Sequence, residues 1–167
     1  MRRIRAVIFD RDGVLIEDVG FPIREDQLKW TAGAQSALAW LANHEILCAI
    51  ATNQSGVARG YFSLDDVHRF NDLLRAHAEA AGGVIATIEL CPHLSDGVVA
   101  PFNIVCECRK PKPGMLINIL KKHQLSPSEV LMIGDREVDL LAARAAGITG
   151  VQFQSGNLLE FVRELIE

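Results

Sequence analysis

Acidic or hydroxyl side chains follow three short apolar stretches of the sequence. They are Asp10 and Asp12 after residues 6–9, Thr52 after residues 47–51, and Asp135 and Asp139 after residues 130–133. Any one of them alone is explained as a turn residue or a helix cap, since Asp and Thr are common in such places. Because all of them come just after an apolar stretch, the pattern favours one shared site.

Several carboxylates that converge with few balancing charges require a cation, and hard oxygen ligands favour Mg²⁺. Mg²⁺ held by few protein carboxylates commonly acts on phosphates, so these residues indicate phosphoryl transfer. Asp10 is the candidate nucleophile and Asp12 the candidate acid/base, and Thr52 and Lys110 would stabilise the phosphoryl group. The competing phosphate motifs, a P-loop or a G-x-G-x-x-G after the first apolar stretch, are absent from the sequence.

Strand-like and helix-like patterns alternate along the chain, which predicts an α/β fold. Apolar runs predict strands at residues 6–9, 47–51, 84–90, 130–133 and 150–153. Helical spacing predicts helices at residues 34–41, 67–81, 115–120, 138–145 and 158–166, and Ser63 with Asp66 resembles a capping box before the second helix. We therefore expect one domain over residues 1–167, a Rossmann-like three-layer sandwich with a mainly parallel sheet of about five strands. In such sheets, ligands bind at the carboxyl ends of the strands.

Three of the four cysteines lie in the one long stretch without helix or strand periodicity, residues 91–113. Together with a histidine they supply a full tetrahedral set for structural zinc: Cys91, His93, Cys106 and Cys108. A disulfide between Cys106 and Cys108 is disfavoured, because neighbours two apart cannot easily reach bridge geometry. The alternative is that these are unrelated small hydrophobes, which is how we interpret Cys48 inside the second predicted strand.

A zinc ion at these four residues would tie together both ends of the 91–108 loop. Cys108 is covalently adjacent to Arg109 and Lys110, so the metal would fix two cations over the phosphate. With four protein ligands the ion would have no open position, which makes it structural and not catalytic.

The composition is ordinary for a soluble globular protein, with 49% hydrophobic and 23% charged residues. With 17 basic and 21 acidic residues, the net charge of −4 argues against nucleic-acid binding through a general basic field. No apolar run approaches the ~20 residues that span a bilayer, so no membrane partner is expected. The basic start, MRRIRAVIFD, has too short an apolar part for a signal peptide, which favours the cytosol.

The segments FDRDGVL and GDREVD, with Thr52 and Lys110 between them, resemble the four motifs of the haloacid dehalogenase superfamily of phosphohydrolases, in the expected order. This resemblance covers nearly the whole chain. Within that superfamily, TNQSGVARG, CPH and CECRKPKPGM look like the D-glycero-D-manno-heptose 1,7-bisphosphate 7-phosphatases. The related histidinol-phosphate phosphatases share the TNQ, CPH and CRKP elements.

The resemblance implies that Mg²⁺ is held by the Asp10 carboxylate, the Asp12 backbone carbonyl and Asp135, and that the Cys₃His set binds zinc. It also implies substrate contacts for Asn53, Gln54, Ser55 and Arg109, and for a rim segment of Asp18, Val19, Gly20 and Phe21. Family members of this size have no large cap domain, so we expect an open site. Monomers occur in the family, and we expect a monomer here.

The sequence departs from the family pattern on the presumed substrate side. Ile16 stands where a small polar residue is usual, Phe21 where Tyr is common, and Arg136 where Lys commonly follows the acid. We include Arg136 among the substrate-facing residues. These departures leave the chemistry untouched and bear on the identity of the sugar phosphate.

The resemblance favours heptose bisphosphate as the substrate, and we expect Arg109, with Arg59 as a second candidate, to hold the phosphate that does not react. Histidinol phosphate or another small phosphomonoester is the alternative. Two further classes stay open: a signalling receiver domain, which also uses acids, a Thr and a Lys, and a zinc module that binds nucleic acid. The paired acids of D-x-D and the zinc segment weigh against the receiver, and the negative charge weighs against the module.

Overall fold

The computed structural model describes residues 3–167, so the first two residues of the basic start lie outside it. Its centre is a five-stranded sheet in the order β3-β2-β1-β4-β5, and every neighbouring pair is parallel. The strands are β1 (Ala6–Phe9), β2 (Leu47–Asn53), β3 (Thr87–Cys91), β4 (Val130–Gly134) and β5 (Thr149–Gln152). The prediction of a parallel sheet of about five strands is confirmed.

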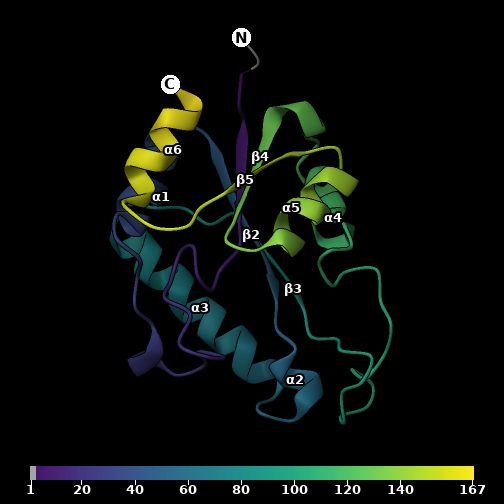
Figure 1. Cartoon of the computed structure of the whole chain (residues 1–167). Coiled ribbons are helices and arrows are strands. Elements are labelled where there is room, and N and C mark those ends of the chain that lie inside the picture. The colour runs from purple at the N-terminus through teal and green to yellow at the C-terminus, as the bar shows by residue number, and fades with distance from the viewer. Residues whose placement is uncertain (1–2) are drawn as a thin grey trace.

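Helices cover both faces of the sheet, which confirms the three-layer sandwich (Figure 1). The α-helices are α1 (Ala34–Asn43), α2 (Gly56–Arg59), α3 (Leu64–Ala80), α4 (Gly114–Lys122), α5 (Glu137–Ala145) and α6 (Leu158–Ile166), with 3₁₀ turns at Glu25–Gln27 and Pro127–Glu129. One face packs against α1, α3 and α6, and the other against α4 and α5. No helix within residues 3–167 is long and apolar enough to cross a membrane.

The alternation of side chains along β1 explains why a four-residue strand belongs to two cores. Val7 and Phe9 join the cluster under α1, α3 and α6, while Ala6 and Ile8 join the cluster under α4 and α5. All four are fully buried, as expected for a central parallel strand. Cys48 in β2 is also buried, and burial raises the pKa of its thiol, in keeping with its interpretation as a small apolar residue.

Helix α3 begins at the capping box that its sequence predicts. The Asp66 amide donates to Ser63 Oγ at 3.1 Å, and the Ser63 amide donates to Asp66 Oδ2 at 2.8 Å. Gly82, with φ of +87°, lies just after the helix, where a left-handed residue is easily provided by glycine.

Several boundaries differ from the predicted ones by one to three residues, and two of these differences, in β2 and β3, bear on the site. β2 runs two residues further, to Asn53, because β3 pairs with it up to the Asn53–Cys91 register. Thr52 and Asn53 are therefore the last two residues of β2 and do not lie in a loop. β3 begins at Thr87 and not at residue 84, and Val84 is exposed. The short helix α2 was not predicted, since four residues are too few to show a helical period.

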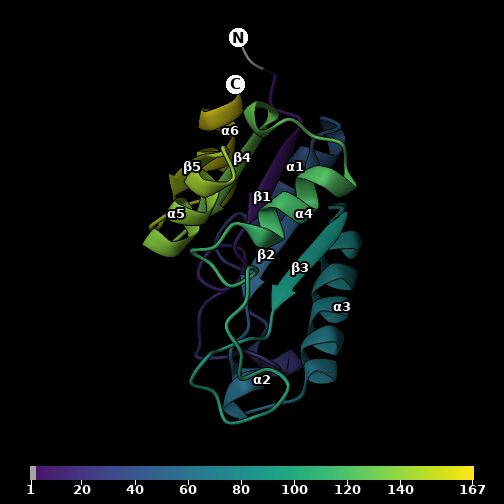
Figure 2. The same ribbon diagram turned by 90° about the vertical axis from the view of Figure 1, so that its right-hand side faces the viewer.

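Figures 1 and 2 place α2 and the loop that follows β3 at the end of the molecule opposite the two labelled termini. The strands run toward that end, so their carboxyl ends meet there. The chain passes outward from β1 to β2 and β3 and then returns to the other side of β1 with β4. The strand order thus reverses between β1 and β4, where a ligand site is expected.

Candidate active site

The carboxyl ends of β1 and β4 bring the first group of acids together. The Asp10 amide donates to the Ile133 carbonyl at 2.9 Å, which links the two strand ends. Gly13 turns the chain with φ of +89°, and a Cβ at this position would overlap the Asp135 carboxylate. The glycine of D-x-D-G is therefore needed for the Asp12 turn and Asp135 to approach one another.

Lys110 lies at the centre of the acidic cluster. Its ammonium is 2.9 Å from Asp10 Oδ1 and 2.6 Å from Asp139 Oδ1, and it donates to the Ala51 carbonyl at 2.7 Å. The Asn53 side chain clamps the lysine backbone, because its Oδ1 accepts from the Lys110 amide at 3.0 Å and its Nδ2 donates to the Lys110 carbonyl at 3.1 Å. The lysine is thus fixed at both its backbone and its charged end.

Asp139 joins this cluster, although the sequence pattern gave it no specific role. It lies in the first turn of α5, where its Oδ2 accepts from the Arg136 amide at 3.1 Å. A Cβ at Gly134 would overlap the Asp139 side chain, so the glycine before Asp135 makes room for the second acid. The position of Asp139 in GDREVD was the available signal, but its pairing with Lys110 depends on the fold.

The electrostatics of the cluster favour an added cation. Burial raises the pKa of Asp10 to about 7; the Lys110 ammonium opposes this rise, and the nearby Asp139 carboxylate adds to it. Burial lowers the pKa of Lys110, but the two carboxylates outweigh this effect and raise it. Oxygens of Asp10, Asp135 and Asp139 lie within 4.8 Å of one another, and the buried Asp135 Oδ1 has no hydrogen-bond partner among the described residues. An all-oxygen set with an unpartnered oxygen fits Mg²⁺.

Asp12 is held by two neighbours beneath the site. Arg11 donates from Nε to Asp12 Oδ1 at 2.7 Å and from Nη2 to Oδ2 at 3.1 Å. Gln54 Nε2 donates to the same Oδ2 at 3.2 Å and to Thr52 Oγ1 at 2.9 Å. We expected Gln54 to face the substrate, but it is buried and does not line the cavity, because its amide bridges Asp12 and Thr52.

A cavity of about 570 Å³ opens above the acids. Its lining includes all four candidate catalytic residues and most of the residues expected to face the substrate. Those expected residues are Asp10, Asp12, Thr52, Lys110, Asp18, Gly20, Phe21, Asn53, Ser55, Arg59, Arg109 and Arg136. Glu137, Val138 and Asp139 complete the wall from α5. The sequence pattern therefore located the cavity, while the roles of its residues stay predictions.

Three arginines line the cavity, each with a different partner. Arg136 pairs with Asp18 at 2.8 Å, an interaction that joins the loops after β4 and β1. Arg59 Nε donates to Ser55 Oγ at 3.3 Å, and the side chain of Arg109 donates only to the His93 carbonyl, at 3.5 Å. Arg59 and Arg109 thus have no carboxylate partner among the described residues, and a phosphate would not have to displace one.

Phe21 lines the cavity, and two further aromatic side chains pack against it. Phe21 has a left-handed backbone with φ of 52°, and its ring lies 5.2 Å from that of Tyr61 and 6.2 Å from that of Phe62. The Phe62 ring in turn fills the space where a Cβ of Gly56 would lie. No sequence pattern predicts the roles of Tyr61 and Phe62, because their contact with Phe21 joins segments far apart in the chain.

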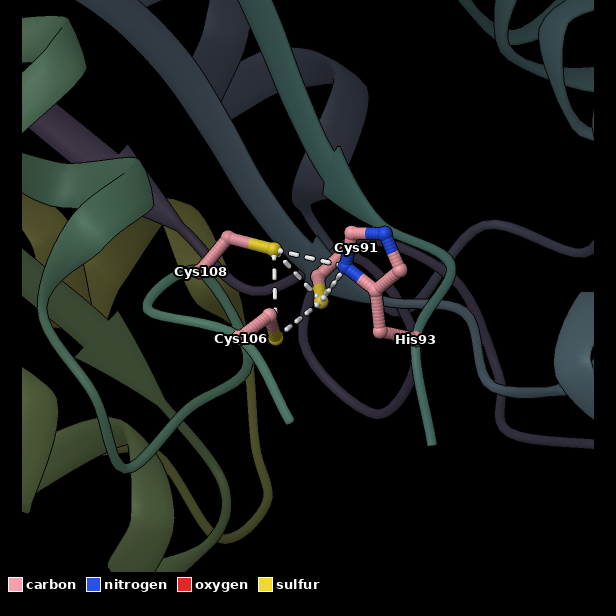
Figure 3. Close-up of side chains that lie close together, drawn as sticks. All are labelled: Cys91, His93, Cys106 and Cys108. Atoms are coloured by element: carbon pink, nitrogen blue, oxygen red, sulfur yellow. Dashed lines mark hydrogen bonds between the residues drawn. The ribbon is translucent and has the colours of Figure 1, made fainter. Parts of the chain in front are cut away.

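The four predicted zinc ligands meet in one cluster, with three sulfurs and His93 Nδ1 turned toward one another (Figure 3). Zinc with ~2.3 Å bonds to sulfur and ~2.0 Å to nitrogen requires edges of about 3.5–3.8 Å in a tetrahedron. The observed edges are 3.6 Å for Cys91–Cys106, 3.5 Å for Cys106–Cys108, 3.6 Å for Cys91–His93 and 3.3 Å for His93–Cys108. Cys91–Cys108, at 2.8 Å, is closer than a bound ion would leave it. All four cysteines of the chain are free thiols, so the donor set fits zinc.

Comparison with known proteins agrees with this geometry. A HAD-hydrolase-like family model matches residues 107–160. The chain is 34% identical to a D-glycero-beta-D-manno-heptose-1,7-bisphosphate 7-phosphatase from Rhodopseudomonas palustris, over 96% of this chain and 89% of the relative. It is 40% identical to a D-glycero-D-manno-heptose-1,7-bisphosphate 7-phosphatase from Thermosynechococcus vestitus, over 90% and 79%. The crystal structure of D,D-heptose 1,7-bisphosphate phosphatase from B. bronchiseptica, complexed with magnesium and phosphate, superimposes with a TM-score of 0.80 at 32% identity, over 96% and 87% of the two chains. The chain therefore belongs to the haloacid dehalogenase-like phosphatases, in the family of the heptose-1,7-bisphosphate 7-phosphatases.

Proposed function

We propose that this phosphatase removes the 7-phosphate of D-glycero-D-manno-heptose 1,7-bisphosphate with the help of Mg²⁺. One observation carries the proposal: a single cavity has a carboxylate cluster around Lys110 at its closed end and Arg59 and Arg109 on its wall. The substrate has a reacting phosphate and a second phosphate, and the cavity has a separate group of charges for each. The relatives named above, both 7-phosphatases, support the same substrate.

The chemistry begins at Asp10. Its carboxylate attacks the phosphorus of the 7-phosphate, the bond from phosphorus to the sugar oxygen breaks, and an aspartyl-phosphate forms. Mg²⁺ bound by the Asp10 carboxylate, the Asp12 backbone carbonyl and Asp135 would supply positive charge beside the phosphoryl oxygens. The Lys110 ammonium and the Thr52 hydroxyl donate to those oxygens from the protein side.

Asp12 moves the protons. It gives a proton to the leaving sugar oxygen in the first step, and as a carboxylate it then takes one from the water that attacks the aspartyl-phosphate. That second step releases inorganic phosphate and restores Asp10. The same side chain serves both steps because the proton that it loses in the first is replaced in the second.

The phosphate that does not react needs a cationic partner away from the acids. Arg109 is adjacent to Lys110 in the chain and lines the same cavity, and its guanidinium can hold a phosphate through two parallel hydrogen bonds. Arg59 approaches from α2. Histidinol phosphate carries an amine in place of a second phosphate, and a wall with two unpaired arginines disfavours that cation.

We also propose a structural zinc ion at Cys91, His93, Cys106 and Cys108. Three edges of 3.5–3.6 Å, which match those of a zinc tetrahedron, support it, together with the absence of disulfides among these thiols. The sequence also favours a monomeric, cytosolic enzyme. A signalling receiver and a nucleic-acid module fit less well than a phosphatase, because the relatives named above are phosphatases.

A phosphate-release assay across heptose 1,7-bisphosphate, simple sugar monophosphates and histidinol phosphate tests the proposal. We expect Mg²⁺-dependent turnover with the highest kcat/KM for the bisphosphate, and position-specific loss of the 7-phosphate by NMR. Asp10→Asn should abolish turnover while the far-UV circular dichroism stays native, because the amide is a poor nucleophile. A higher kcat/KM for histidinol phosphate would transfer the assignment to that substrate, and near-native activity of Asp10→Asn would refute the covalent mechanism.

A further inference from the structure

Arg11 is the most deeply buried charged residue in the neighbourhood of the site. Its relative exposure is 0%, and it is among the largest fully buried side chains of the described residues. The guanidinium makes two hydrogen bonds to Asp12, donates from Nη1 to Asn71 Oδ1 at 2.9 Å, and donates from Nη2 to the Pro22 carbonyl at 3.3 Å. It also lies 4.7 Å from the centre of the Phe70 ring.

These contacts join three parts of the fold at one side chain. Arg11 follows β1, Asn71 and Phe70 belong to α3, and Pro22 belongs to the segment that continues the cavity rim. Asn71 is itself buried, and its Nδ2 has no partner among the described residues while its Oδ1 faces the guanidinium. A buried amide donor without a partner costs stability. The orientation of the Asn71 amide is therefore explained by the hydrogen bond that its oxygen accepts from Arg11.

Stability alone explains this arrangement poorly. Removing a guanidinium and a carboxylate from water is costly, and well-packed apolar residues of similar volume are often equally or more stabilising than a buried ion pair. The pair does, however, fix a geometry. Arg11 holds both oxygens of Asp12, and Gln54 holds Oδ2 a second time, so the carboxylate has one orientation open to it.

We propose that Arg11 is a positioning residue for Asp12: it holds the carboxylate in the orientation from which Asp12 exchanges protons, and α3 anchors the arginine through Asn71 and Phe70. This inference rests on the proposed acid/base role of Asp12. Arg11 does not itself line the cavity and has no hydrogen bond to Asp10, Asp135 or Asp139, and the lining residue that its guanidinium contacts is Asp12, so its effect passes through Asp12. Orientation matters for this step, because a misplacement of about 1 Å can cost roughly 100-fold in rate.

The test compares Arg11→Met and Arg11→Lys with the native enzyme on a sugar monophosphate at saturating Mg²⁺, because a sugar alkoxide, unlike p-nitrophenolate, needs a proton from Asp12 to leave. We expect Arg11→Met to lower kcat by roughly 100-fold, with KM changed by less than about threefold, because proton transfer and not binding is lost. Arg11→Lys should recover part of kcat, since an ammonium keeps the charge but not the two-point grip. Arg5→Met is the control for the same substitution away from the site. Arg5 precedes the first residue of β1 and pairs with Glu129 at 3.4 Å, so its loss should leave kcat unchanged.

A double variant separates positioning from general damage. In an Asp12→Asn background, Arg11→Met should lower kcat by less than about threefold, because the side chain through which it acts is already disabled. Independent structural damage would instead multiply the two losses, and that outcome would overturn the proposal. Native-like kcat in a folded Arg11→Met protein would overturn it as well.

Should Arg11→Met fail to fold, Asn71→Ala and Arg11→Lys decide the matter. Asn71→Ala keeps the arginine and removes its anchor on α3, so kcat should fall by roughly three- to tenfold with KM unchanged. Native kcat in both folded proteins would refute the positioning role. Failure of the proposed function would be seen in other measurements. The native enzyme would not prefer the bisphosphate in the phosphate-release assay, or Asp12→Asn would be fully active, and neither measurement involves Arg11.

Discussion

The raised pKa of Asp10 predicts how the stability of the metal-free protein depends on pH. In the unfolded chain this carboxyl has an ordinary pKa of 3.8, and in the folded protein burial raises it to about 7. Between these two values the folded state holds a proton that the unfolded state releases. The stability that Asp10 contributes is therefore fully present below the unfolded pKa and is lost as the pH rises through about 7.

The size of the effect follows from proton linkage. One extra proton in the folded state changes the free energy of unfolding by about 1.4 kcal/mol per pH unit. From pH 5 to the folded pKa this amounts to roughly 3 kcal/mol, and above pH 7 the Asp10 contribution levels off. Asp10 is 9% exposed, so solvent screening reduces the figure little.

Urea unfolding of chelator-treated protein at pH 5 and pH 8 measures this difference. Asp10→Asn removes the titrating group and keeps the shape of the side chain. From pH 5 to pH 8, the free energy of unfolding of the variant should therefore rise by roughly 3 kcal/mol relative to that of the native protein. Asp65→Asn, on the exposed first turn of α3, is the control for the loss of an aspartate. Native and Asp10→Asn curves that run parallel from pH 5 to pH 8 would refute the reasoning.

The same measurement with Mg²⁺ present tests the cation site. At pH 8 Asp10 is ionised, and the ion should raise the free energy of unfolding of the native protein. At pH 5 a proton on Asp10 competes with the metal, so the gain at equal Mg²⁺ concentration should be smaller. An equal gain at both pH values, or an undiminished gain in Asp10→Asn, would contradict the assignment of Asp10 as a ligand.

Further predictions concern three separate features. Protein purified without chelator should carry about one zinc per chain by elemental analysis, and Cys108→Ser should lower both zinc content and turnover; zinc-free protein with full activity would contradict the site. Gly13→Ala should raise the Mg²⁺ concentration for half-maximal turnover by roughly tenfold or more, because its Cβ would displace Asp135, whereas Gly156→Ala, with φ of +104° and open space, controls for backbone strain. Arg109→Ala should cost the bisphosphate ~1.5–3 kcal/mol in kcat/KM and a monophosphate less; equal losses would assign Arg109 to the reacting phosphate.

The fold was predictable because the sequence repeats one simple unit. Each strand is a short apolar run with helical spacing after it, and a strand buried on both faces needs no polar alternation. The polar residues at the strand ends could be located for the same reason, since parallel strands end on one edge. The zinc cluster was predictable from residue type and spacing, although the closeness of its halves depends on the 91–108 loop.

The remainder required three-dimensional contacts. A charged residue between two acids, as Arg11 is, would ordinarily be exposed, and its contacts with Asn71 and Phe70, about 60 positions away, explain its burial. The pairing of Asp139 with Lys110 joins α5 to the segment after the zinc cluster, which no local pattern encodes. Gln54 follows Asn53 in the same apparent loop, but the extension of β2 turns the two side chains to different surroundings.

Arg109 and Lys110 are neighbours in sequence but are held by different interactions. Asn53 clamps the lysine backbone on both sides. Arg109 is held by ligands of the proposed zinc site, since its amide donates to Cys106 Sγ at 3.3 Å and its guanidinium to the His93 carbonyl at 3.5 Å. Zinc removal should therefore displace Arg109 further than Lys110, and kcat/KM should fall more for the bisphosphate than for p-nitrophenyl phosphate. Equal losses after chelation and Mg²⁺ restoration would show that the cluster holds both cations, and that the asparagine clamp alone does not keep the lysine in place.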